Sequence, residues 1–138
     1  MKYVLLFLLN SNNEILLLRR FNTDFGSGQY SLPGGKVEDK ETAKLAIIRE
    51  TFEEVGIHIK PENLEFVHLL FRNGTEGVFD VACFKANQWS GEVTNREPKK
   101  ADEIKWFSKN ALPENLLPAH KQIIEMITQK IYYSEHGF

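Results

Sequence analysis

Residues 35–57 read GKVEDKETAKLAIIRETFEEVGI and contain the clearest helix signal in the chain. Asp39 is a candidate N-cap, and good helix formers run from Glu41 to Val55. Gly56 follows at the C′ position, where glycine commonly ends a helix because it tolerates the left-handed conformation. The stretch therefore predicts one helix that begins near residue 41 and ends near residue 55.

One side of this predicted helix is acidic. Successive residues rotate by about 100° around a helix axis, so Glu50, Glu53 and Glu54 fall close together. Glu50 and Glu54 are like charges four residues apart, which destabilises a helix by roughly 0.2–0.5 kcal/mol unless a cation lies between them. Because this energy is small, it does not separate a metal site from an ordinary solvated acidic face. The predicted core stripe is Leu45, Ile48, Phe52 and Val55, and Ala43, Ala46 and Ile47 share the acidic side.

The spacing within residues 35–57 resembles the Nudix box, G-x5-E-x7-R-E-U-x-E-E-x-G-U, in which U is a bulky aliphatic residue. A chance match of this kind has a probability on the order of 10⁻⁷ in a chain of this length. Thr51 is the departure, because the pattern has an aliphatic residue there. Since threonine is close to valine in shape, we expect altered packing and intact chemistry. The matching residues are Gly35, Glu41, Arg49, Glu50, Glu53, Glu54, Gly56 and Ile57.

The resemblance implies a hydrolase that uses Mg²⁺, with Mn²⁺ as a possible substitute. Glu50 and Glu54 would be the principal metal ligands, and Glu53 a further ligand or catalytic carboxylate. The backbone carbonyl of Gly35 would also reach the metal, and Arg49 would orient the carboxylates. Mg²⁺ prefers oxygen ligands and keeps several waters, so a few carboxylates together with substrate phosphates suit it. The reaction would be displacement at phosphorus by a metal-activated water.

Glu41 has two interpretations. In the family it would support the junction between the loop and the helix. It could equally be an ordinary acid in the first helical turn, where the helix dipole favours negative charge.

The polar loop from Ser90 to Asp102 resembles a segment that supplies an additional acid in MutT-related members of the family. Such an acid acts as an extra metal ligand or as a general base. We expect Glu97 to fill this role, then Glu103, then Asp102 in order of preference. Trp106, which follows the loop, is expected to pack in the core and not against a base.

Substrate contacts are expected at two places. Arg20 ends the second predicted strand, and it either contacts phosphates or is a solvated surface charge. Asn115 and Leu117 belong to a segment that resembles the one that holds the purine in relatives cleaving 8-oxo-dGTP. Those relatives have two aspartates where this chain has Ala119 and His120, so we expect lower selectivity for 8-oxo-dGTP.

The elements around residues 35–57 complete a mixed pattern of strands and helices. Apolar runs on either side of the Asn/Ser-rich residues 10–13 predict a β-hairpin. The order strands, helix, strands, helix predicts an α/β (α+β) fold with a sheet packed between helices, which is also the Nudix fold. The remaining predicted elements are strands at Leu64–Phe71, Val78–Phe84 and Glu103–Phe107, a turn at Asn73-Gly74, and a helix from Pro118 to about Tyr132.

Composition fits one globular domain spanning residues 1–138. A formal net charge of −2 argues against a stable complex with a nucleic-acid polymer. The lone Cys83 cannot form an intrachain disulfide, which suits the cytoplasm. The apolar run at Val4–Leu9 is too short to span a membrane and has no cleavage signal. The histidines show no ligand spacing and are expected at or near the surface: His58, His68, His120 and His136.

The leading hypothesis is a pyrophosphohydrolase that converts a nucleoside triphosphate, (d)NTP, to a monophosphate and pyrophosphate, and a homodimer is compatible with it. Two alternatives stay open. One is a nucleotide-sugar or dinucleotide hydrolase, and the other is a nucleotide-sensing module without catalysis. The complete set of acidic residues in the box argues against a pure sensor, which has no need of all of them.

Overall fold

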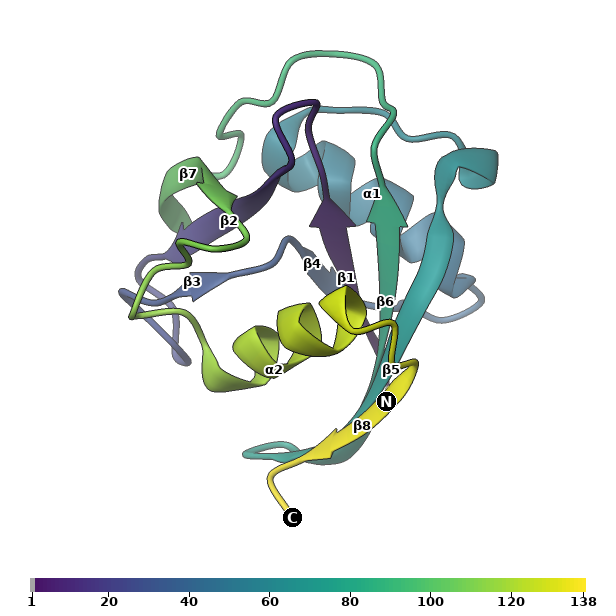
Figure 1. Cartoon of the computed structure of the whole chain (residues 1–138), viewed down its shortest axis with the longest axis vertical. Helices are drawn as coiled ribbons and strands as arrows, with labels where there is room; N and C mark the ends of the chain where they lie inside the picture. Colours follow the sequence, from purple (N-terminus) through teal and green to yellow (C-terminus); the bar gives the residue numbers. More distant parts are fainter. Residues whose placement is uncertain (1) are drawn as a thin grey trace.

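Two α-helices and two β-sheets make up the fold, which the computed structural model describes over residues 2–138 (Figure 1). In chain order the elements are β1 (Lys2–Leu8), β2 (Glu14–Arg20), β3 (Tyr30–Ser31), β4 (Gly34–Lys36), α1 (Ala43–Val55), the 3₁₀ turn η1 (Pro61–Asn63), β5 (Glu65–Gly74), β6 (Gly77–Ala86), β7 (Ala101–Ser108), α2 (Pro118–Thr128) and β8 (Tyr133–His136). One sheet is mixed and has five strands in the order β4-β1-β6-β5-β8. The other has three antiparallel strands in the order β3-β2-β7.

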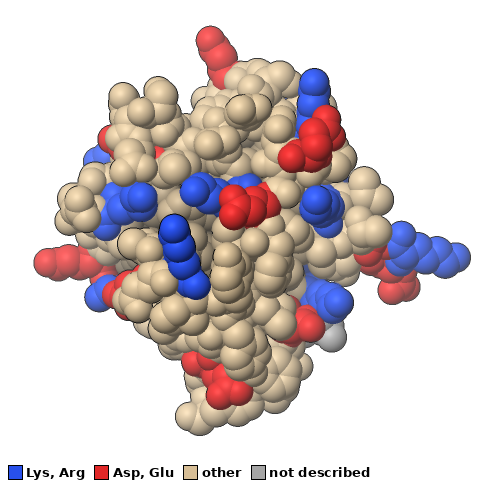
Figure 2. Space-filling model, turned by 45° about the vertical axis from the view of Figure 1, so that its right-hand side comes forward, with Lys and Arg blue, Asp and Glu red and all other residues tan. Residues whose placement is uncertain are grey.

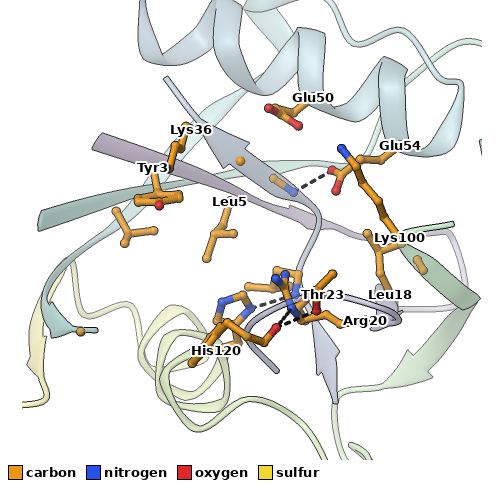
Figure 3. Close-up of a pocket in the computed structure, with 18 of the residues that line it drawn as sticks. Tyr3, Leu5, Leu18, Arg20, Thr23, Lys36, Glu50, Glu54, Lys100 and His120 are labelled. Carbon is orange, nitrogen blue, oxygen red and sulfur yellow. Dashed lines mark hydrogen bonds between the residues drawn. The ribbon is translucent and has the colours of Figure 1, made fainter. Parts of the chain in front are cut away.

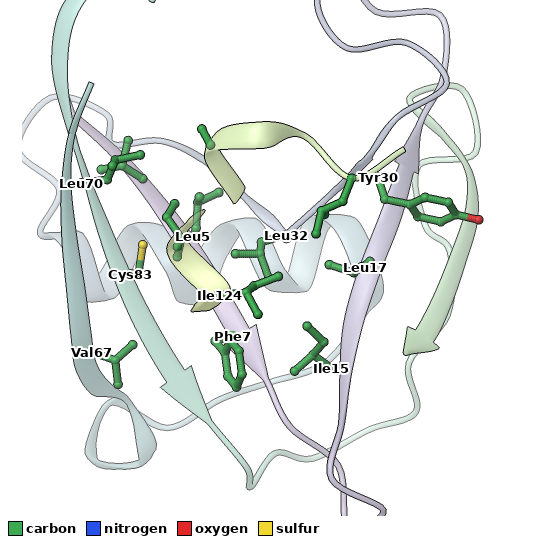
Figure 4. Close-up of a cluster of buried hydrophobic side chains, with 14 of the residues drawn as sticks. Leu5, Phe7, Ile15, Leu17, Tyr30, Leu32, Val67, Leu70, Cys83 and Ile124 are labelled. Carbon is green, nitrogen blue, oxygen red and sulfur yellow. The ribbon is translucent and has the colours of Figure 1, made fainter. Parts of the chain in front are cut away.

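The helices cover opposite faces of the sheets, with α2 in front and α1 behind in the view of Figure 1. The core accordingly has two layers. Ile123 and Ile124 of α2 pack in one layer (Figure 4), and Ile47 of α1 packs in the other. Strand β1 contributes to both, since Leu5 belongs to the first layer and Leu6 to the second. A strand buried on both faces is apolar throughout. The predicted α/β (α+β) class, with a mixed sheet between helices, is confirmed.

The first two strands do not form the predicted hairpin. Strand β1 pairs with β6 and β4, whereas β2 pairs with β3 and β7. Within residues 2–138, only an isolated bridge between Leu9 and Ile15 joins the two, next to a turn in which Asn10 N donates to Glu14 O at 3.0 Å. The turn residues reverse the chain as predicted. The strands then diverge into different sheets (Figure 1), because their pairing partners lie far away in the sequence.

Helix α1 begins later than predicted. Thr42 is its N-cap, and the Thr42 Oγ1 accepts a hydrogen bond from Leu45 N at 3.1 Å, so Asp39 does not cap the helix. Gly56 ends the helix as predicted, in the left-handed conformation with φ of 75°. Glu41 therefore precedes the helix, and the interpretation of this residue as a first-turn acid is wrong.

The predicted core face of α1 is correct at Val55, which is fully buried, and at Ile48, which packs partly against the core, but it is wrong at Leu45 and Phe52. Leu45 is 53% exposed and Phe52 is 36% exposed. The helix packs the side that carries Ala46, Ile47 and Thr51 on the sheet. The Thr51 hydroxyl lies within this side and donates to Ile47 O at 2.6 Å, so the buried hydroxyl has a hydrogen bond. As a consequence, Glu50 and Glu54 point into a cavity of the protein, whereas Glu53 is exposed. The buried residues of α1 are Ala46, Ile47, Thr51 and Val55.

Three other boundaries differ from the sequence-based expectations. Helix α2 ends at Thr128 and not near Tyr132, because the chain turns to add β8 to the sheet edge beside β5. The turn between β5 and β6 lies at residues 75–76 and not at residues 73–74, which are paired in the strand. Strand β7 begins at Ala101, slightly before its predicted start.

Two of the histidines are more buried than expected. His68 is fully buried, and its ring nitrogens lie 2.7 Å from Ile131 O and 2.7 Å from the Ser134 Oγ, which ties β5 to the segment around β8. His120 is buried as well. Cys83 is buried in the core.

Acidic and basic side chains are interspersed on the face shown in Figure 2, without a continuous basic field. Among residues 2–138, no helix combines the length and apolar character that crossing a bilayer would require.

Candidate active site

A cavity of about 760 Å³ opens where β1 and β2 diverge. Its walls include Leu5 of β1 and Arg20 of β2, so both sheets contribute to it. Glu50 and Glu54 project from α1 on one side, while Arg20 and His120 lie on the other (Figure 3). The cavity therefore has an acidic wall and a more basic wall facing each other.

Glu54 carries the most perturbed carboxylate of this cavity. Its Oε1 accepts a hydrogen bond from Gly34 N at 2.9 Å. Burial raises the pKa of Glu54 well above its usual range, and repulsion from Glu50 and Glu97 acts in the same direction. The Gly34 N–H and, more weakly, Arg20 oppose this rise. A cation beside the carboxylate would relieve both the desolvation and the repulsion.

Glu50 lies against the backbone of β4. A Cβ atom on Gly35 would overlap with the Glu50 carboxylate, so the absence of a side chain at position 35 is what allows the two to approach. Burial raises the pKa of Glu50, whereas its hydrogen bond from Arg49 lowers it. The Gly35 backbone therefore lies directly beside a carboxylate of α1, and the predicted contact of its carbonyl with a metal stays a prediction.

Arg49 holds the acidic groups in position. Its Nε and Nη2 donate to the two Glu41 oxygens at 2.8 and 3.0 Å, and its Nη1 donates to the Glu50 Oε1 at 3.0 Å. The Arg49 Nη2 also donates to Lys36 O at 3.0 Å, which ties α1 to β4. The hydrogen bond from Arg49 lowers the pKa of Glu41 to about 2. Glu53 is exposed and only reaches the Arg49 Nη1 at 3.4 Å.

Of the three loop acids considered, Glu97 lines the cavity together with Glu50 and Glu54. Asp102 and Glu103 do not line it, because they bind Arg19 on β2 at 2.7 and 3.1 Å. Of the three acids, the geometry thus favours Glu97 as the extra metal ligand or general base.

The loop that carries Glu97 is fixed to the end of α1. Arg96 N donates to Glu54 O and Thr94 N donates to Val55 O, each at 3.0 Å. Asn95 Nδ2 donates to Ala101 O at 2.8 Å. These bonds set the position of the Glu97 backbone relative to the helix carboxylates.

The residues expected to contact substrate separate into two groups. Arg20 lines the cavity, and its Nε donates to Phe25 O at 2.8 Å. Asn115 and Leu117 do not line it. The Asn115 Nδ2 donates to Gly28 O at 2.9 Å, and Leu117 is buried at 3% exposure. Both therefore support the loop before β3, and their predicted contact with substrate stays a prediction.

Several cavity residues were not anticipated from the sequence. Tyr3, Phe79 and Arg72 gather around one part of the wall, and the Tyr3 hydroxyl donates to Glu76. For Arg72 the sequence does contain an indication of a functional role, because a charged residue follows the apolar run of β5. His120 lines the cavity too, and its Nδ1 accepts from Leu32 N at 2.9 Å. Trp106 packs against the core and stacks on Trp89, as expected for a residue that does not contact a base.

The acidic wall fits a hard divalent cation. Glu50, Glu54 and Glu97 present carboxylate oxygens, and their mutual repulsion and desolvation favour a bound positive charge. In residues 2–138 no three Asp, Glu, His or Cys side chains are already grouped as a complete metal-binding set. Mg²⁺ commonly uses one or two carboxylates and takes further ligands from water and substrate phosphates.

Comparison with known proteins gives consistent matches. A family model described as NUDIX domain matches residues 1–127. The chain is 29% identical over 115 residues to an 8-oxo-dGTP diphosphatase of Escherichia coli (strain K12), covering 83% of this chain and 86% of that protein. It is 33% identical over 118 residues to an ADP-ribose pyrophosphatase of Methanocaldococcus jannaschii, covering 86% and 68%. The crystal structure of a MutT NUDIX hydrolase from Burkholderia pseudomallei superposes with a TM-score of 0.82 at 25% identity, covering 90% of this chain and 95% of that one.

Proposed function

The chain belongs to the Nudix hydrolase family, and from that premise we propose that it hydrolyses nucleoside triphosphates to nucleoside monophosphates and pyrophosphate with Mg²⁺. The observation that carries the proposal is the cavity that Glu97 lines and in which Glu50 and Glu54 face Arg20 (Figure 3). Carboxylates are suited to a metal ion, and the guanidinium is suited to phosphate oxygens.

Each residue of the acidic wall has a proposed role. Glu50 and Glu54 hold the metal through carboxylate oxygens, with the carbonyl of Gly35 beside them. When bound, the divalent cation would neutralise phosphate charge and lower the pKa of a water molecule. Arg49 keeps Glu50 in place through its 3.0 Å hydrogen bond. Glu53, at the rim, would contribute through water.

Glu97 is proposed as the group that accepts the proton of the attacking water. It is placed on a loop that is bonded to the end of α1, so its distance from the helix carboxylates is constrained. Arg20 on the facing wall would bind phosphate oxygens and orient the substrate, together with Lys100, whose Nζ lies 3.6 Å from the Glu97 Oε2.

The proposal is tested by a panel of substrates with purified protein. dGTP, dCTP, dATP, dTTP, 8-oxo-dGTP, ADP-ribose and a dinucleotide are incubated with Mg²⁺, with Mn²⁺ and with a chelator. Pyrophosphate and monophosphate are measured separately. Release of pyrophosphate from triphosphates, lost with the chelator, is the expected result.

Two other outcomes would contradict it. Preferred cleavage of ADP-ribose or the dinucleotide would assign the chain to that substrate class, with which its ADP-ribose pyrophosphatase relative is compatible. Nucleotide binding without turnover of any compound would favour a sensing module.

A further inference from the structure

Arg72 of β5 lines the cavity. Its Nε is buried and has no hydrogen-bond partner among residues 2–138. The guanidinium carbon lies 5.4 Å from the centre of the Phe25 ring and 5.9 Å from that of Phe79. Burial lowers the pKa of Arg72, and the opposing effect comes from the Tyr3 phenol.

Two other arginines of the chain have carboxylate partners within the protein. Arg49 binds Glu41 and Glu50, and Arg19 binds Asp102 and Glu103. A buried donor without an acceptor is costly, so such a group in a cavity points to an acceptor that comes from outside the protein.

The position of Arg72 separates its role from that of Arg20. Both guanidiniums lie over the Phe25 ring, at 5.9 Å for Arg20 and 5.4 Å for Arg72, but that of Arg72 also lies 5.9 Å from the centre of the Phe79 ring, which packs on Tyr3. The effects on the pKa of Arg72 come from burial and Tyr3, and no carboxylate of the acidic wall is among them. If the phosphates lie between the metal ligands and Arg20, then Arg72 faces the nucleoside end of the substrate.

Two aromatic rings restrict the Arg72 guanidinium, and the side chain still lines the cavity. Phe25 and Phe79 restrict the guanidinium, which reduces the entropy lost when a ligand is bound. A Cβ on Gly74 would lie 3.7 Å from the Arg72 Nε and 3.2 Å from Phe79. Because position 74 has no side chain, the Phe79 ring and the Arg72 side chain can lie close to the backbone of β5 there.

We propose that Arg72 reads the base of the substrate by donating two parallel hydrogen bonds to an edge with two adjacent acceptors. This inference rests on the proposed function. Guanine offers such an edge at O6 and N7, and cytosine offers one at N3 and O2. Adenine and thymine place a donor beside every acceptor on the corresponding edges, so they leave one donor of the guanidinium unpaired.

The test compares kcat/KM for dGTP, dCTP, dATP and dTTP in the wild type, Arg72→Met and Arg72→Lys. The wild type should favour dGTP or dCTP over dATP and dTTP by roughly ten- to a hundredfold. Both variants should lose this preference by slowing only the favoured substrate. Arg72→Lys keeps the charge but not the planar fork, so it separates base reading from attraction to phosphate. Arg19→Gln, which changes an arginine outside the cavity, should leave the preference unchanged.

Two analogues identify the edge that is read. If the base is guanine, 7-deaza-dGTP and 8-oxo-dGTP should both be poorer than dGTP, because one has a C–H and the other an N–H at position 7. If the base is cytosine, dCTP alone should be favoured.

Equal slowing of all four substrates in Arg72→Met, with activity restored in Arg72→Lys, would show a phosphate contact and overturn the proposal. An unchanged preference in both variants would overturn it too.

Binding without turnover separates this inference from the proposed function. Without metal, the wild type should bind dGMP or dCMP more tightly than dAMP and dTMP, and Arg72→Met should bind all four alike. This result is expected even if no triphosphate were hydrolysed. Because Arg72→Met removes a half-buried charge whose Nε has no hydrogen-bond partner among residues 2–138, its melting temperature without ligand should be at least that of the wild type. Equal binding of the four monophosphates by the wild type would overturn the inference and leave the hydrolase proposal standing.

Discussion

At the scale of single residues, Glu54 combines burial with charge repulsion. Glu54→Gln removes the charge and keeps an oxygen that can accept from Gly34 N. We expect turnover to fall at least about a hundredfold, on the scale of losing a group that acts in the transition state. Steady-state kinetics and circular dichroism would measure activity and fold. Glu125→Gln, an exposed change on α2, is the matched control. Turnover near that of the wild type in Glu54→Gln would remove Glu54 from the metal site.

The raised pKa values of Glu50 and Glu54 also predict how Mg²⁺ affects stability. A carboxyl whose pKa is raised in the folded state holds more protons there than in the unfolded state, so the protein without metal loses stability as pH rises above about 4.5. Mg²⁺ binds the ionised form, and should therefore raise the melting temperature more at pH 8 than at pH 5. Thermal melts with and without Mg²⁺ measure this. Glu50→Gln should abolish most of the rise, and an equal Mg²⁺ response in that variant would contradict the site.

Positions 119 and 120 predict weak selection of oxidised guanine. Ala119 is 1% exposed and offers no polar side chain. Burial lowers the pKa of His120 to about 3, so the ring is neutral and its Nδ1 is occupied by Leu32 N. Each missing buried hydrogen bond reduces discrimination by roughly ten- to a hundredfold. We expect 8-oxo-dGTP, dGTP and dCTP all to be hydrolysed. A preference for 8-oxo-dGTP of about a thousandfold or more in kcat/KM, beyond what one or two contacts supply, would refute this.

At the scale of elements, α1 shows what spacing predicts and what it does not. The positions of Glu50, Glu53 and Glu54 relative to one another follow from the helical repeat, so the sequence predicted the acidic cluster. The helix face that is buried depends on the sheet beneath it. Small residues there allow α1 to approach β4, while Leu45 and Phe52 are left partly exposed.

Thr51 tests the packing of this helix face. Its hydroxyl is buried and donates to Ile47 O, a carbonyl within the same helix. In Thr51→Val that carbonyl keeps its helical backbone partner, so no buried donor is left unsatisfied. We expect a change in the free energy of unfolding within about 1 kcal/mol and kcat/KM within about twofold. Denaturant melts and kinetics would measure both, and a large loss of activity at unchanged stability would mean that the hydroxyl has a role in the site.

The loop before β7 predicts which acid acts in catalysis. Glu97→Gln should lower turnover more than Asp102→Asn or Glu103→Gln, by roughly 10²- to 10⁴-fold if Glu97 is the general base. The two control acids bind Arg19 and lie outside the cavity. Kinetics over a range of pH would compare the three variants. A larger effect of Glu103→Gln would show that this loop is assigned in the wrong register.

At the scale of the whole molecule, long-range pairing separates what could be predicted from what could not. The class of the fold follows from the order of strands and helices, and it was predicted. The hairpin of β1 and β2 was wrong because local turn signals do not encode which strands pair. Arg72 was missed for a similar reason, since its lack of a partner is visible only once β1, β5 and the loop at Phe25 come together.

The separation of β1 from β2 also has a consequence during synthesis on the ribosome. Lys2 lies opposite Asp80 in the β1–β6 ladder, so the first strand has no partner on that side until the sixth strand has been made. At translation rates of ~5–20 residues per second, the apolar strand β1 lacks its β6 partner for several seconds. Nascent chains of this protein should therefore bind a chaperone that recognises apolar segments. They should release this chaperone only after β6 leaves the exit tunnel.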